Sequence, residues 1–183
     1  MSAAPATLPP LPRLGSREGW FDALRPFAYL NHAAVAPHAG PVRAAVLACM
    51  DAYAAEGIGG FGATLARRQA LRARLAALLG ADGDELAFVP NTTAGVITVA
   101  QSIAWTPGDR VVLFRGEFPA NTTPWQLVAK QHGLELVWLD LADFDESDDQ
   151  GLAALDSALA RGVRLVAVSA VQFRSGLRMP LEA

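Results

Sequence analysis

Two short segments hold the residue types from which ligand chemistry can be expected. Each segment follows an apolar run and precedes a helical pattern. The first segment, Asn91–Gly95, reads Asn-Thr-Thr-Ala-Gly. The first turn of a helix has unpaired N–H groups and the positive end of the helix dipole, so this segment could hold a phosphate, with threonine hydroxyls as further donors. Ordinary helix capping by Asn and Thr is the alternative, and it requires no ligand.

The second segment, Glu117–Asn121, places an aromatic residue, Phe118, directly after an apolar run. A flat side chain at that point can stack on the ring of a ligand, although packing in the core or at its rim would also account for it. The threonines lie one strand–helix unit earlier. Taken together, the two segments favour a phosphorylated aromatic ring as the ligand.

The sequence around these segments alternates short apolar runs with helical patterns, which predicts an α/β fold with a mostly parallel sheet and helices on both faces. Right-handed crossovers bring the strand-to-helix loops to one edge of such a sheet, where ligands bind. The strands are expected at Leu86–Val89, Val111–Phe114, Leu136–Leu139 and Val163–Ser169. Helices are expected at about 93–105, 124–132 and 152–160, and an acidic surface loop at Asp143–Asp149.

The N-terminal third has a different pattern. Residues 1–15 are expected to form a loose arm, followed by a short helix over Ser16–Leu24 with Ser16 as its cap. Two longer helices are predicted at about 42–55 and 64–79, separated by a flexible break over Gly57–Gly62. Gly80 is predicted to end the second of them in a left-handed conformation.

Composition limits the classes of partner and compartment. The 183 residues are 52% hydrophobic and carry a net charge of −3, which predicts neither a nucleic-acid nor a membrane-surface partner. Cys49 is the single cysteine, so no disulfide forms within the chain. The first residues do not resemble a signal peptide. We therefore expect a cytoplasmic protein, and we assign no residue to a metal site.

The two segments resemble the class V aminotransferase family of pyridoxal-phosphate enzymes, which includes cysteine desulfurases, kynureninases and isopenicillin-epimerase-like proteins. The resemblance runs from about Tyr29 to the end, includes Tyr29–Ala34 and Leu165–Gly176, and is most specific over Val111–Trp125. It implies the large domain of the aspartate-aminotransferase-like fold, in incomplete form. It also implies pyridoxal 5′-phosphate as cofactor, an amino acid as small-molecule substrate, and a homodimer.

The same resemblance assigns roles to individual residues. Thr92, Thr93 and Ala94 would hold the phosphate, and Phe118 would stack on the ring. Gln172 would lie near the ring hydroxyl or the substrate, and an alignment shifted by one residue would put Phe173 there instead. Cysteine desulfurases have a histidine where this chain has Phe118. Because phenylalanine cannot move protons, the resemblance disfavours a desulfurase.

The resemblance divides the chain into an N-terminal arm with a small-domain segment, residues 1–60, and a partial cofactor-binding large domain, residues 61–183, that ends before the family's Schiff-base lysine. The only lysine, Lys130, falls near the end of a predicted helix and is interpreted as a surface residue. We therefore assign no catalytic residue to the chain and expect no covalent attachment of the cofactor at the usual site.

The expected function is that of the N-terminal part of an enzyme that transaminates, epimerises or eliminates from an amino acid, inactive as the isolated chain. One alternative is a non-enzymatic binding or dimerisation module derived from the same fold. A nucleotide- or methyl-donor-binding Rossmann-like domain is a weaker alternative, because no glycine-rich fingerprint follows the first predicted strand.

Overall fold

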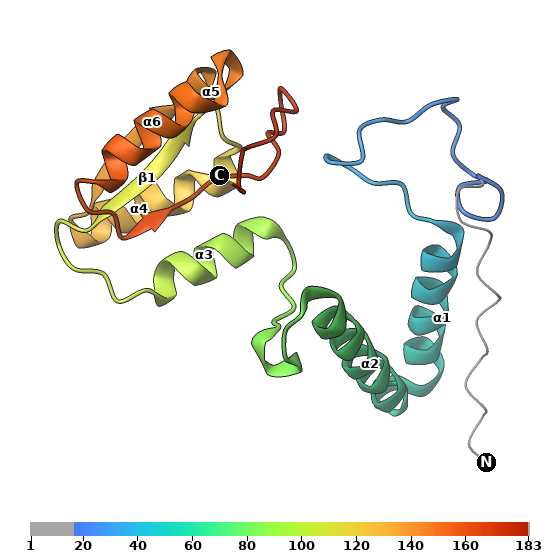
Figure 1. Cartoon of the computed structure of the whole chain (residues 1–183). Helices are drawn as coiled ribbons and strands as arrows, with labels where there is room; N and C mark the ends of the chain where they lie inside the picture. Colours follow the sequence, from blue (N-terminus) through green and yellow to red (C-terminus); the bar gives the residue numbers. More distant parts are fainter. Residues whose placement is uncertain (1–16, 183) are drawn as a thin grey trace. The chain divides into compact units, whose positions relative to one another are not determined.

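The computed structural model describes residues 17–182 and divides into two compact units, one ending at Ala87 and the other beginning at Phe88 (Figure 1). The predicted domain boundary lies between residues 60 and 61. The predicted boundary divides the chain by the domains of the family, whereas the two units are divided by compactness. The predicted boundary therefore stays a prediction. Within the described residues, no helix is both long enough and apolar enough to cross a membrane.

The first unit is built from local helical structure. It contains α1 (Gly40–Glu56), the 3-10 turn η1 (Gly57–Gly60), α2 (Phe61–Leu79) and the 3-10 turn η2 (Gly83–Glu85). Gly80 ends α2 with φ 63° and ψ 34°, in the left-handed conformation that the sequence predicts. Among the described residues of this unit, only Gly60 and Ala76 are buried. The unit therefore has almost no core of its own.

Two predictions for this unit are wrong. The break over Gly57–Gly62 is helical, because η1 continues directly into α2. The short helix over Ser16–Leu24 is not formed: Ser16 lies outside the described residues, and residues 17–24 form turns in which Trp20 and Phe21 both donate to the Arg17 carbonyl. So short a helix has few intrahelical bonds to offset the cost of its nucleus.

The second unit has the predicted α/β architecture. Its parallel sheet has the strand order β2-β1-β3, with Val111 paired to Leu136 on one side and to Leu165 on the other. The elements in chain order are α3 (Thr92–Ser102), β1 (Arg110–Arg115), η3 (Pro119–Asn121), α4 (Thr123–His132), β2 (Glu135–Asp140), α5 (Ala142–Glu146), α6 (Asp148–Leu159) and β3 (Leu165–Val166).

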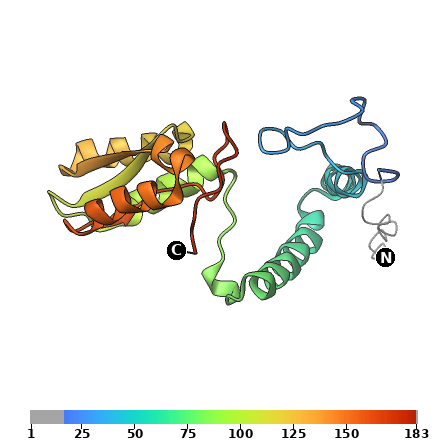
Figure 2. The same cartoon turned by 45° about the horizontal axis from the view of Figure 1, so that its top comes forward.

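The central strand β1 has helices on both sides because its side chains alternate between the two faces of the sheet. Val111 and Leu113 lie in one apolar cluster with residues of α3 and α4, namely Ala100, Trp125 and Val128. Val112 and Phe114 lie in the other with residues near or within α5 and α6, among them Phe144 and Ala158. Figure 2 shows α4 and α6 on opposite sides of β1. The prediction of helices on both faces is confirmed.

Two of the four predicted strands need correction. Leu86–Val89 is not a strand and has no place in the β2-β1-β3 sheet, although Leu86 itself is extended with φ −104° and ψ 127°. The predicted strand Val163–Ser169 shrinks to Leu165–Val166, with one further ladder bond from Ala167 to Val112. It ends there because the Ser169 N–H donates to the Glu117 side chain instead of to a strand.

The predicted acidic loop at Asp143–Asp149 is also wrong, because most of it is helical. Phe144, 4% exposed, anchors α5 in the core. The Ser147 hydroxyl then caps α6 by accepting the Gln150 N–H at 3.1 Å. Asp148 and Asp149 in the first turn of α6 complement the positive end of its dipole.

A glycine substitution tests the packing of α6. A Cβ atom at Gly151 would overlap the Phe144 ring, whereas a Cβ atom at Gly95 would meet Val89 at 3.5 Å, an ordinary contact. Both glycines are fourth residues of their helices. We expect Gly151→Ala to lower the free energy of unfolding by about 1–3 kcal/mol. Gly95→Ala should be neutral or stabilising by about 0.5–1 kcal/mol, because alanine favours helix.

The urea midpoint, followed by tryptophan fluorescence, measures both glycine variants. An unchanged midpoint for Gly151→Ala would contradict the close approach of α6 to Phe144.

Candidate functional site

The loop after β1 and the first turn of α3 meet at one side of the second unit (Figures 1 and 2). A hollow of about 360 Å³ lies between them and the start of α4. Its walls are mostly apolar, and it is lined by Thr93, Ile97, Phe118, Pro119, Ala120, Thr123, Pro124 and Leu127. The structure thus brings together two predicted site residues, Thr93 and Phe118, around a single cavity.

Asn91 organises the first turn of α3. Its backbone is extended, and its Oδ1 accepts the Ala94 N–H at 2.9 Å. Thr92 and Thr93 are exposed, and no described residue accepts a hydrogen bond from their backbone N–H groups. Capping by Asn91 therefore coexists with two open donors at the positive end of the helix, an arrangement that fits an anion. Ala94 is the third residue predicted to hold the phosphate. It differs from Thr92 and Thr93, because its backbone N–H already donates to Asn91 Oδ1.

Phe118 lies at the rim of the hollow. Its side chain is 51% exposed, and its ring meets the Phe173 ring edge to face, with centroids 5.2 Å apart and planes at 81°. The contact with Phe173 accounts for one part of the ring as rim packing, and the exposed part remains available to a flat ligand. The contact with Phe173 thus fits the interpretation of Phe118 as rim packing, and the exposed part of its ring fits the interpretation as a stacking surface for a ligand.

Gln172 is almost completely buried, at 3% exposure. Its Nε2 donates to Glu117 Oε1 at 3.0 Å, whereas its Oε1 accepts no hydrogen bond from the described residues. A buried acceptor without a donor costs about 1–3 kcal/mol. An N–H or O–H group of a ligand would remove this cost, but Gln172 does not line the hollow and its Oε1 is itself buried, so the ligand role of Gln172 stays a prediction. Phe173, the alternative from a shifted alignment, instead contacts Phe118.

Glu117 is the residue of the site that sequence reasoning missed. It is 8% exposed and accepts three hydrogen bonds, from the Ser169 N–H at 2.6 Å, the Ser169 hydroxyl at 2.7 Å and Gln172. Gly116, with φ 93°, allows the chain to turn sharply between β1 and Glu117. The available signal was an acidic residue directly after a buried strand, where a carboxyl group needs partners.

Lys130 does not line the hollow. Its side chain is exposed in the last turn of α4, whereas the hollow is lined by Thr123 at the start of the same helix and by Leu127, one turn before Lys130. The interpretation of Lys130 as a surface residue agrees with this position.

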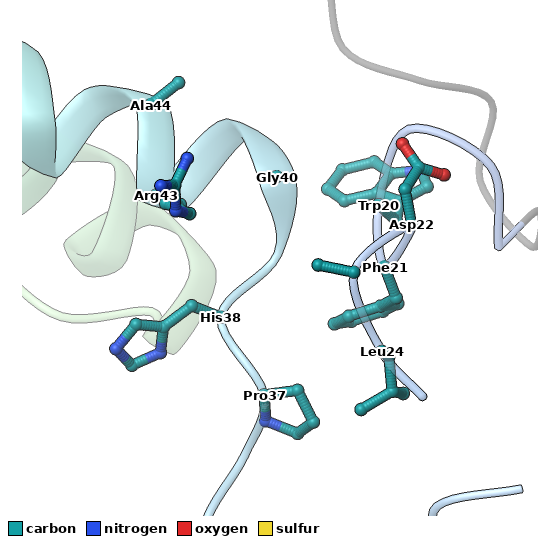
Figure 3. A pocket seen from close by; sticks show the side chains of 10 residues that line it. Trp20, Phe21, Asp22, Leu24, Pro37, His38, Gly40, Arg43 and Ala44 are labelled. Atoms are coloured by element: carbon teal, nitrogen blue, oxygen red, sulfur yellow. The ribbon is translucent and has the colours of Figure 1, made fainter. Parts of the chain in front are cut away.

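The first unit contains a larger hollow, of about 600 Å³, between residues 20–24 and 37–44. Figure 3 shows Trp20 and Phe21 on one wall and Gly40 and Arg43 on the other. The Gly40 N–H donates to the Trp20 carbonyl at 2.7 Å, which ties the two walls together. None of the predicted site residues lines this hollow. Size alone does not identify a functional site, and only the smaller of these two hollows is lined by predicted site residues, Thr93 and Phe118.

A cysteine desulfurase and an isopenicillin N epimerase are among the proteins to which this chain is similar in sequence. A cysteine desulfurase of Pectobacterium atrosepticum is 34% identical over 168 residues, which are 87% of this chain and 40% of the relative. Isopenicillin N epimerase of Streptomyces clavuligerus is 33% identical over 109 residues, 60% of this chain and 27% of the relative. The chain therefore spans two fifths or less of these two relatives.

Solved structures of pyridoxal-phosphate and cysteine desulfurase proteins are similar to this chain in fold. The cysteine desulfurase CsdA of Escherichia coli has a TM-score of 0.67 and 25% identity, over 84% of this chain and 40% of that chain. A C-DES variant with glycine covalently linked to its PLP cofactor also has a TM-score of 0.67, with 24% identity, over 76% of this chain and 37% of that chain. The model of the family described as aminotransferase class-V matches residues 28–183. The chain belongs to the class-V aminotransferase family.

Proposed function

We propose that this chain forms the phosphate- and ring-binding part of a pyridoxal-phosphate enzyme that acts on an amino acid. The observation that carries the proposal is the shared hollow, in which Thr93 from the first turn of α3 and Phe118 from the loop after β1 line one cavity. Pyridoxal phosphate has the two matching parts, an anionic phosphate and a flat ring. Family membership supports the same cofactor.

The residues that line the hollow, together with Thr92 and Gln172 outside its lining, divide the work of binding. The open N–H groups of Thr92 and Thr93 bind the phosphate, and Phe118 holds the ring flat. Ile97 and Leu127 add apolar wall, which limits the water around the ring. Gln172 presents a hydrogen-bond acceptor. When bound, the cofactor supplies an electron sink for bonds at the α-carbon of the amino acid.

The reaction that the enzyme catalyses is transamination, epimerisation or elimination. Phe118 has no group that takes up or releases a proton, so a proton transfer near this face of the ring falls to another residue. This is our reason for disfavouring a desulfurase despite the likeness to that class. The isolated chain is proposed to be inactive, because its single lysine does not line the hollow.

A binding or dimerisation module is the second candidate, and one surface favours it. Val42, Val46 and Met50 recur at four-residue spacing on α1 and are 52%, 50% and 61% exposed. An apolar stripe of this kind suits a partner chain. The homodimer and the cytoplasmic location both stay predictions.

Substitution of Thr93 tests the phosphate part of the proposal. Thr93→Val removes a hydroxyl donor and should weaken the binding of pyridoxine 5′-phosphate about ten- to a hundredfold. This probe lacks an aldehyde and does not react with amines. Thr98→Val is the matched control, because Thr98 lies on the same helix and its hydroxyl already donates to the Ala94 carbonyl at 2.8 Å. Isothermal titration calorimetry compares the dissociation constants.

Substitution of Phe118 tests the ring part. Phe118→Ala should weaken binding of the same probe by a few-fold to about tenfold through lost stacking. Phe118→His should bind like the parent, because a histidine ring also stacks. If Thr93→Val and Phe118→Ala both bind the probe with parental affinity, the two loops are only packed turns and the proposed function fails.

Covalent labelling tests the position of Lys130. We expect no stoichiometric attachment of pyridoxal phosphate to Lys130 after borohydride reduction, because the exposed Lys130 side chain does not line the hollow. Peptide mass spectrometry gives the labelled fraction, with Lys130→Arg as the blank. Complete modification at one equivalent of cofactor would mean that the site has been misplaced.

A further inference from the structure

Glu117 and Gln172 form a pair whose geometry has a consequence for ligand selection. Both side chains are more than nine-tenths buried, at 8% and 3% exposure. They lie 55 positions apart in the sequence and join the loop after β1 to the loop after β3. Burial excludes the water that could otherwise satisfy either side chain, so their orientation depends on each other and on Ser169.

The carboxyl group of Glu117 determines which end of the Gln172 amide faces it. Glu117 Oε1 also accepts the Ser169 N–H, at 2.6 Å. It is therefore fixed as an acceptor, and only the Nε2 end of Gln172 can approach it favourably. A flipped amide would bring two oxygens together. As a result, Gln172 Oε1 must face the other way, where it has no donor among the described residues.

We propose that Glu117 is a positioning residue that locks the Gln172 amide, so that Oε1 selects ligands with an N–H or O–H donor at this point. The inference rests on the proposed function for the identity of the ligand. Glu117 and Gln172 lie beside the hollow rather than in its lining: Phe118, which follows Glu117, lines the hollow, and its ring contacts that of Phe173, which follows Gln172. The donor can come from the ring hydroxyl of the cofactor or from the amino group of an amino acid.

Three probes distinguish these sources. Pyridoxamine 5′-phosphate has both donors, its 3-deoxy analogue lacks the ring hydroxyl, and 4-deoxypyridoxine 5′-phosphate lacks the amino group. Calorimetry with the parent chain should show about five- to tenfold weaker binding for the one probe that lacks the selected donor. Equal binding of all three probes would overturn the selection.

Variants separate positioning from a purely structural effect. Glu117→Leu removes the acceptor, frees the amide and should reduce the discrimination between probes to within twofold. Glu117→Gln should restore it, because its carbonyl oxygen can still accept from Ser169 and Gln172. Ser169→Ala removes one hydrogen bond to the same carboxyl group and leaves the Gln172 contact, so it should keep the discrimination of the parent. A folded Glu117→Leu chain that discriminates like the parent would refute the proposal.

A measurement without ligand covers the remaining outcomes. The side-chain amide protons of Gln172 should exchange slowly with deuterated solvent in the parent and in Glu117→Gln, because burial and the hydrogen bond to residue 117 protect them. Exchange in the parent as fast as that of a solvent-exposed glutamine side chain would refute the lock, including the case in which Glu117→Leu fails to fold. If the protons are protected but no probe binds, the lock stands without a ligand role, and the proposed function fails.

Discussion

The burial of β1 on both faces is the constraint on which the second unit depends. Four consecutive residues, Val111 to Phe114, are at most 1% exposed. Because side chains alternate along a strand, this burial requires one helical layer on each side, and the helices must be connected through loops at the ends of the sheet. The hollow lies at one such end. The position of Phe118 and Glu117 is therefore a result of how β1 is packed.

The helices and strands that could be predicted from the sequence are those that depend on residues close together in the chain. Runs such as Val111–Phe114 and Leu136–Leu139 are apolar over the length of a strand, and glycines such as Gly80 and Gly133 mark helix ends. Leu86–Val89 has the same apolar character but is not a strand of the sheet. Pairing is a property of the assembled sheet, and no residue pattern within four positions records it.

The site was predicted to a similar degree. Thr93 and Phe118 were placed together from the rule that strand-to-helix loops share an edge, and the shared hollow agrees, although the segment before Thr93 is not a strand in the structure. The importance of Glu117 could not be predicted, because its partners Ser169 and Gln172 are 52 and 55 positions away. The sequence shows an acidic residue after a strand, but only the fold shows that the residue is buried and what it binds.

The three-stranded sheet has two edges of unequal character. β2 begins and ends with exposed carboxyl groups, those of Glu135 and Asp140, and charges at a strand end discourage pairing with a foreign strand. β3 is only Leu165–Val166, both of them apolar, and Val166 is 37% exposed. Neither residue of β3 is charged, so no charge within the strand discourages pairing at its outer backbone groups. In a concentrated solution of this chain, aggregation by strand addition would therefore start from the β3 edge rather than from the β2 edge.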